Sequence, residues 1–156
     1  MPTLTSSRPF AAAVLRLFAA LFALVFAGCT SVQLVSAYDE GTDRGITEFQ
    51  KSVETFLTGL ERTGRPAGAL TRDEAAFFQK AEVDLSALRV RAAVIPKNDI
   101  TIAMLRNLTD SMALLEELVP TGITREQVKP LRDALNASTG AILKLELAKK
   151  RGEPAK

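Results

Sequence analysis

The side chains that most often carry out catalysis are scarce in this sequence, which contains one cysteine and no histidine. Without histidine the usual general base is absent, so a Ser-His-Asp triad and the Glu-x-x-His pairs of di-iron bundles are excluded. Two other routes are a carboxylate pair and a Ser-Lys dyad. Acidic neighbours occur at 39–40, 73–74 and 116–117, but adjacent side chains on a helix point about 100° apart. We therefore expect no enzymatic activity, no cofactor and no metal site.

The single thiol, Cys29, follows a segment that has the features of an export signal. Residues 1–16 carry two arginines and no acidic residue, and residues 17–27 form an uninterrupted apolar run. The run is too short to span a bilayer comfortably, and a charged region followed by a short apolar region is typical of a secretory signal peptide. Ala27 and Gly28 are small enough to let an extended backbone enter the narrow cleft of a peptidase.

The residues Phe26-Ala27-Gly28-Cys29 resemble the lipobox of bacterial lipoprotein precursors, which signal peptidase II reads and which usually has the form Leu-Ala/Ser-Gly/Ala-Cys. The resemblance implies that residues 1–28 are a signal peptide cut between Gly28 and Cys29. It also implies that Cys29 is lipidated on sulfur and acylated, for example with palmitate, on its new amino group. Two or more acyl chains anchor a protein stably to a membrane.

The same resemblance implies a location. Thr30 follows the cysteine, whereas aspartate at this position retains lipoproteins in the inner membrane of enterobacteria-like cells. We therefore expect the periplasmic face of the cell outer membrane, with the inner membrane as the alternative. Two other interpretations of the segment stay open, namely an uncleaved transmembrane helix over 10–28 and a conventional signal peptide that leaves a thiol at Cys29.

The charge of the chain argues against a nucleic-acid partner. The sequence has 20 basic and 18 acidic residues, and two of the basic ones, Arg8 and Arg16, belong to the N-terminal segment. The remainder has 18 of each, because 20 − 2 = 18. Binding to nucleic acid needs a basic field, which this balance does not provide.

Apolar residues recur at steps of three and four through the rest of the chain, which predicts amphipathic helices. We call the row of residues that each helix should turn toward the core its seam. The expected seams are Ile46, Phe49, Val53, Phe56 and Leu60 in the first helix; Phe78, Ala81, Leu85, Leu88, Ala92 and Ile95 in the second; Leu105, Leu108, Met112, Leu115 and Val119, widened by Leu114 and Leu118, in the third; and Val128, Leu131, Leu135, Ser138, Ile142 and Leu145 in the fourth. Projected backward, the first seam reaches Val32, Val35, Asp39 and Thr42.

Helix ends are marked by residues with known capping chemistry. Thr71 and Thr124 each begin a capping-box pattern, completed by Glu74 and Gln127. Prolines and glycines at 64–68, 96 and 120–122 separate the helical stretches. The pattern predicts an all-α fold, an up-down antiparallel four-helix bundle over 29–147 followed by a basic C-terminal tail at 148–156. The alternative is a three-helix bundle with a tethering N-terminal helix.

A polar stretch at 38–45 stands at the start of the first helix. Asp39 or Thr42 can cap that helix. A second interpretation is a polar interaction patch at the membrane-proximal end of the bundle, formed by Tyr38, Asp39 and Thr42, in which Asp39 pairs with a basic residue of another helix or Tyr38 contacts a partner. A third is a cation site at Asp39, Glu40 and Asp43, although the spacing is not that of an EF-hand loop.

Together these patterns predict a lipid-anchored, non-catalytic cell-envelope lipoprotein that acts as a structural or protein-interaction module. The stretch 31–57 is also similar to uncharacterised small helical envelope lipoproteins of Gram-negative bacteria. Its expected partners are the membrane, through acylated Cys29, and an envelope protein. The alternative is a periplasmic helical bundle that binds a lipid or other small apolar ligand, for which Ala81, Ala92 and Ser138 would leave room. A cavity in the core would favour the ligand, and a filled core with an exposed apolar groove would favour the protein.

Overall fold

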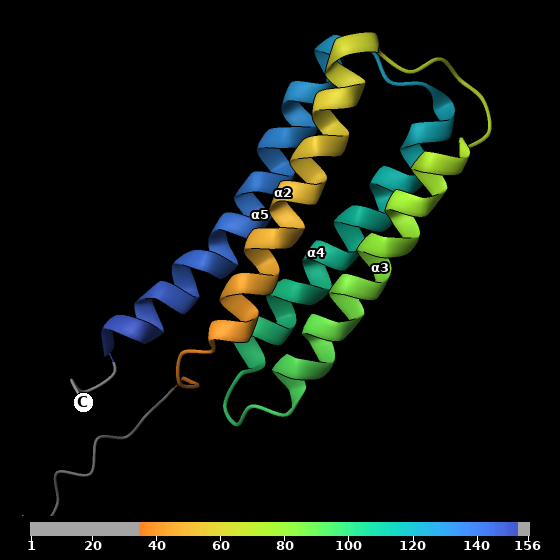
Figure 1. Cartoon of the computed structure of the whole chain (residues 1–156). Coiled ribbons are helices and arrows are strands. Elements are labelled where there is room, and N and C mark those ends of the chain that lie inside the picture. The colour runs from red at the N-terminus through yellow and green to blue at the C-terminus, as the bar shows by residue number, and fades with distance from the viewer. Residues whose placement is uncertain (1–34, 153–156) are drawn as a thin grey trace, which may run out of the picture. The chain divides into compact units, whose positions relative to one another are not determined.

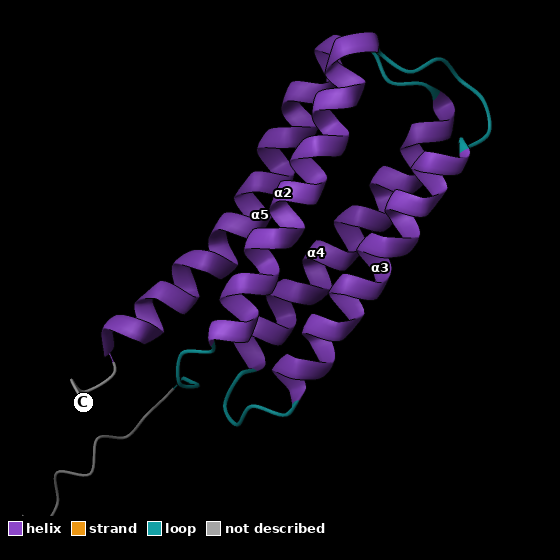
Figure 2. Cartoon of the chain, in the orientation of Figure 1, coloured by secondary structure: helices purple, strands orange, loops and turns teal. Residues whose placement is uncertain are grey.

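The computed structural model describes residues 35–152, which form an all-α four-helix bundle. Its helices are α2 (Glu40–Thr63), α3 (Arg72–Ala93), α4 (Asp99–Leu118) and α5 (Arg125–Gly152), with a short 3₁₀ turn, η1 (Val119–Thr121), after α4. Each helix runs antiparallel to the one before it, as Figures 1 and 2 show. α2 and α4 each pack against both α3 and α5. The predicted up-down four-helix bundle is therefore confirmed.

Both ends of the described chain lie at one end of the bundle, which we call the base (Figure 1). The base comprises the starts of α2 and α4 and the ends of α3 and α5. The opposite, far end carries the connections at 64–71 and 119–124. There an isolated antiparallel bridge joins Arg65 to Ile123, and the Arg65 guanidinium bonds both carboxylate oxygens of Glu74 at 3.0 Å.

The core is one cluster of buried apolar side chains that runs between the four helices. It contains Ile46, Phe49, Val53, Leu57, Leu60, Phe78, Ala81, Leu85, Leu88, Ala92, Leu105, Leu108, Met112, Leu115, Val119, Ile123, Val128, Leu135 and Ile142. Most of the expected seam residues are members. None of the helices within residues 35–152 has the combination of length and apolar character needed to cross a bilayer.

Two details of the expected seams are wrong. In α2, Leu57 takes the core position, and Phe56 lies on the flank, where its ring stacks on Phe77 with centroids 4.1 Å apart. In α4, Leu114 and Leu118 do not widen the buried stripe, because both side chains are exposed.

In α5 the buried face differs from the expected seam, and this changes the chemistry of the core. Thr139 and Glu146 are buried in place of the expected Ser138 and Leu145, which are half-buried. The helix also continues to Gly152, into the stretch assigned to the tail, and Lys149 is buried in its last turns. The lower part of the core is therefore polar.

The start of the first helix also differs from the backward projection of the seam. α2 begins at Glu40, and Val35 lies in a bend before it, so the seam does not continue to Val35. Val32 lies outside the described residues. The two capping boxes differ. Thr71 and Glu74 form both bonds of a capping box. At the second one, the Thr124 N–H donates to Gln127 Oε1 at 2.8 Å.

Candidate functional site at the base

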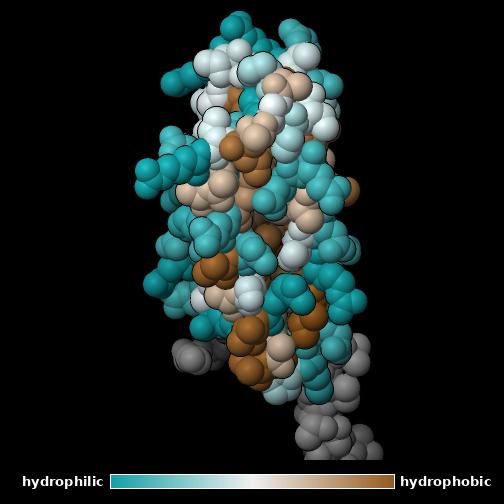
Figure 3. Space-filling view, turned by 90° about the vertical axis from the view of Figure 1, so that its right-hand side faces the viewer, coloured by the Kyte–Doolittle hydropathy of each residue, from teal (hydrophilic) through white to brown (hydrophobic). Residues whose placement is uncertain are grey.

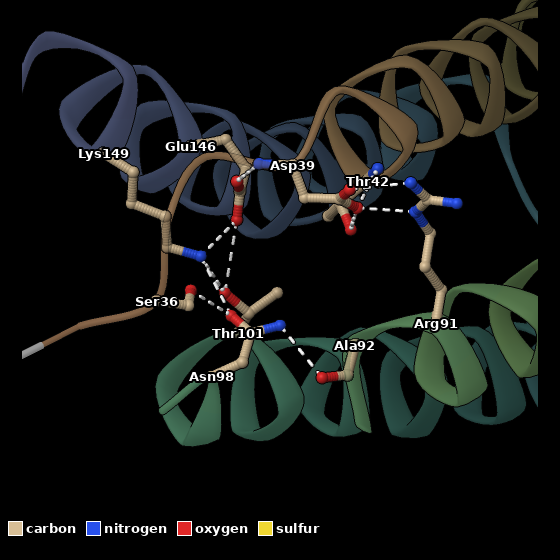
Figure 4. A network of polar contacts seen from close by, with 9 residues as sticks. All are labelled: Ser36, Asp39, Thr42, Arg91, Ala92, Asn98, Thr101, Glu146 and Lys149. Carbon is tan, nitrogen blue, oxygen red and sulfur yellow. Dashed lines mark hydrogen bonds and ion pairs between the residues drawn. The ribbon is translucent and has the colours of Figure 1, made fainter. Parts of the chain in front are cut away.

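Asp39 links the start of α2 to the end of α3. Its carboxylate caps α2 by accepting from the Thr42 N–H at 2.9 Å and the Thr42 hydroxyl at 2.7 Å. It also accepts from Arg91 Nε at 2.6 Å and Nη2 at 2.7 Å (Figure 4). Gly41 makes this possible, since a side chain there would occupy the space of the Arg91 guanidinium. The guanidinium bonds, together with those from Thr42, hold the pKa of Asp39 well below its usual range.

Glu146 and Lys149 form an ion pair inside the base. They lie one turn apart on α5 and are 0% and 7% exposed, with 2.5 Å between Lys149 Nζ and Glu146 Oε1. The ammonium donates two further bonds of 2.9 Å, to Asn98 Oδ1 and Thr101 Oγ1. Glu146 also accepts from the Thr101 hydroxyl at 3.3 Å and the Asp39 N–H at 3.1 Å. Both buried charges are thus compensated by each other and by neutral partners.

Asn98 joins this pair to the segment that precedes α2. Its amide oxygen accepts from the Ser36 hydroxyl at 2.8 Å, and its amide nitrogen donates to the carbonyl of Ala92 at 3.1 Å. The Ser36 N–H donates to the carbonyl of Lys97 at 2.9 Å. Asn98 is also the N-cap residue of α4, but its side chain makes no cap bond because these buried groups use it.

Tyr38 lies at the edge of the cluster. Its hydroxyl donates to Asp43 Oδ2 at 2.8 Å, and Lys150 Nζ lies 4.9 Å from the centre of its ring. The bond to Asp43, with the negative charge around it, raises the pKa of Tyr38 to about 12. The phenol therefore stays protonated at neutral pH and serves as a hydrogen-bond donor.

The donors of the cluster bind acceptors within it. All three donors of the Lys149 ammonium are used, and the Ser36 hydroxyl donates its proton to Asn98, so these two residues do not form a Ser-Lys dyad. The three acids 39, 40 and 43 do not converge: Asp39 faces Arg91, Glu40 pairs with Arg44, and Asp43 accepts from Tyr38. Among residues 35–152 no group of three potential ligands is placed to hold a metal ion.

The sequence predicted part of this site. Tyr38, Asp39 and Thr42 lie together at the base, and Asp39 pairs with a residue of another helix, whereas Gly28 and Cys29 lie outside the described residues. Ser36, Arg91, Thr101, Glu146 and Lys149 were missed. One signal was present, because 135, 139, 142, 146 and 149 continue one seam in steps of four and three. Polar residues on a seam indicate a buried polar cluster.

Comparison of the chain with family models, with curated proteins and with solved structures found no match.

The effect of pH on stability follows from the pKa of Asp39. Because that pKa is lowered in the folded state, the carboxylate stabilises the fold above its usual range, and this contribution is lost as the pH falls through 3.8 toward the folded value. Asp39→Asn keeps a good cap but removes the charge, so we expect a loss of about 1 kcal/mol at pH 7. Chemical unfolding at pH 7 and pH 3 should show a smaller pH effect in the variant than in the wild type.

The matched control is Asp133→Asn, which removes a surface carboxylate paired with Lys129. It should leave stability within about 0.5 kcal/mol at either pH. Equal pH effects in Asp39→Asn and the wild type would show that the Asp39 charge does not stabilise the folded protein.

Proposed function

We propose that this chain is a lipid-anchored, non-catalytic lipoprotein of the cell envelope, which acts as a structural or protein-interaction module. The observation that carries the proposal is the closed polar cluster at the base. Its donors and acceptors bind one another, and they fasten the segment 36–39 to α3, α4 and α5. Such a cluster suits a structural joint between a domain and the chain that precedes it.

The anchor itself is proposed from the sequence. Acylated Cys29 would hold the domain at the periplasmic face of the outer membrane, or of the inner membrane as the alternative. Confinement to a membrane raises the effective concentration of the domain toward a partner in the same layer, so a modest intrinsic affinity suffices.

Intact-mass measurement of protein from the membrane fraction tests the anchor. The wild type should lack residues 1–28 and carry the mass of the acyl chains, whereas Cys29→Ala should keep the segment and carry no acyl mass. Ser31→Ala, two residues away, is the control and should behave as the wild type. If Cys29→Ala has the same mass and location as the wild type, the lipoprotein assignment fails and a transmembrane helix over 10–28 replaces it.

One observation favours the alternative function, binding of a small apolar ligand. A cleft of about 220 Å³ opens between α3 and α4, and its lining includes the core residues Phe78, Ala81, Leu85 and Met112. A bound lipid that is recovered by extraction from the wild type, and lost when Ala81→Leu fills the cleft, would support this function. Recovery of no lipid from the wild type would count against it.

A further inference from the structure

Large apolar side chains are exposed at the base of the bundle. Val90 and Val94 at the end of α3 are 65% and 76% exposed, Ile100 in the first turn of α4 is 49% exposed, and Leu147 near the end of α5 is 44% exposed. Figure 3 shows apolar surface at the lower end of the face that α3 and α4 form. By contrast, the far-end connections at 64–71 and 119–124, all within the described residues, contribute no exposed large apolar side chain.

The turn between α3 and α4 is the centre of this surface. It forms the lower tip of the bundle in Figure 1 and has the sequence Val94-Ile95-Pro96-Lys97. The Ser36 N–H donates a hydrogen bond to the carbonyl of Lys97. The next residue, Asn98, is buried in the polar cluster. These contacts fix the conformation of the turn that carries the exposed apolar residues.

Cations accompany the apolar residues. Lys97 is exposed in the turn, and Lys150 and Arg151 are exposed at the end of α5, which also lies at the base. Apolar side chains next to lysine and arginine suit the boundary between acyl chains and anionic headgroups.

The position of the proposed anchor, Cys29, favours the lipid bilayer as the partner of this apolar surface. Cys29 precedes Val35 by six residues, and six residues span at most about 20 Å when fully extended. An acylated Cys29 would therefore keep the base within that distance of the bilayer. This step rests on the function proposed above.

We propose that the base docks on the lipid surface, with Val94 and Ile100 entering the interface and the cations at 97, 150 and 151 contacting anionic headgroups. The acyl chains of Cys29 then act together with a protein surface, and the base is the end of the bundle that faces the membrane. Its far end, with the Arg65–Ile123 bridge, points away from the bilayer.

The absence of tryptophan from the sequence allows a direct test with a single reporter. Val94→Trp, made in the full chain, is purified with its anchor and reconstituted in vesicles of phosphatidylcholine and phosphatidylglycerol. The matched control is Leu114→Trp, at an exposed position toward the opposite end of α4. We expect brominated acyl chains to quench the fluorescence of Val94→Trp about twofold, because interfacial side chains lie about 5–10 Å deep, and to leave that of Leu114→Trp unquenched. Circular dichroism checks that both variants stay helical.

Intact-mass measurement of the same samples distinguishes failure of the docking proposal from failure of the lipid-anchor proposal. Acylated protein in which Val94→Trp is quenched no more than Leu114→Trp would overturn the docking and leave the anchor standing. Protein without acyl chains in which Val94→Trp is still quenched would support the docking and overturn the anchor. Blue-shifted emission from Val94→Trp that brominated lipid does not quench would assign the surface to a protein partner or a second copy, and would also overturn the docking.

Discussion

Lys149→Met should lower the free energy of unfolding by about 3–5 kcal/mol, because it leaves the Glu146 carboxylate buried without its cation. The side chains of Lys149 and Glu146 are 3% and 1% exposed, so water does not replace the lost partner. Asn98 and Thr101 lose a donor in the same change. Chemical unfolding followed by circular dichroism measures the effect.

Two variants separate the charge effect from the loss of packing. Glu146→Leu combined with Lys149→Met removes both charges and should cost less than Lys149→Met alone, since no unpaired ion stays in the core. Lys144→Met, on an exposed position of the same helix, should change stability by no more than about 0.5 kcal/mol. If Lys149→Met were as mild as Lys144→Met, the buried ion pair would not contribute to stability.

Leu57→Ala should cost about 2–5 kcal/mol, because it opens a cavity in the middle of the bundle. Leu57 is 1% exposed and belongs to the core cluster. The seam expected from the sequence places Phe56 in the core instead. The structure therefore predicts the larger loss of stability at Leu57, whereas the expected seam predicts it at Phe56. Phe56→Leu keeps most of the apolar volume and loses the stacked contact with Phe77, which is worth about 0.5–1.5 kcal/mol.

Thermal or chemical unfolding of the two variants distinguishes the registers of α2. Leu114→Ala serves as the control, because its side chain is 66% exposed and its loss should be nearly neutral. If Phe56→Leu lowered the free energy of unfolding more than Leu57→Ala does, Phe56 and not Leu57 would occupy the core position of α2.

The fold could be predicted from the sequence because its signals are local. Apolar steps of three and four define a helix face wherever the chain is, and residues such as Thr71, Pro96 and Gly122 end or begin a helix through their own chemistry. Whether Phe56 or Leu57 occupies the core position could not be predicted in this way. It depends on the neighbouring helix, since Phe77 gives Phe56 a partner outside the core, and no local pattern contains that information.

The polar cluster was harder to predict for a related reason. A lysine near a helix end normally extends to solvent and interacts favourably with the helix dipole, so Lys149 was assigned to the tail. Its burial depends on Glu146, Asn98 and Thr101 meeting it from two helices. Asp39 was identified because its capping role is local, whereas its partner Arg91 lies 52 residues away and could be named only from the structure.

The bonds of Ser36 and Asp39 also give the domain a mechanical property. A pull on the chain before Val35 reaches the bundle first at Ser36, which is bonded to Lys97 and Asn98, and then at Asp39, which is bonded to Arg91 and Glu146. The force is divided among α3, α4 and α5 before it acts on the first turn of α2. Tension on the chain before Val35 is therefore carried by α3, α4 and α5 before it reaches α2, and the domain resists being unravelled from its N-terminal end.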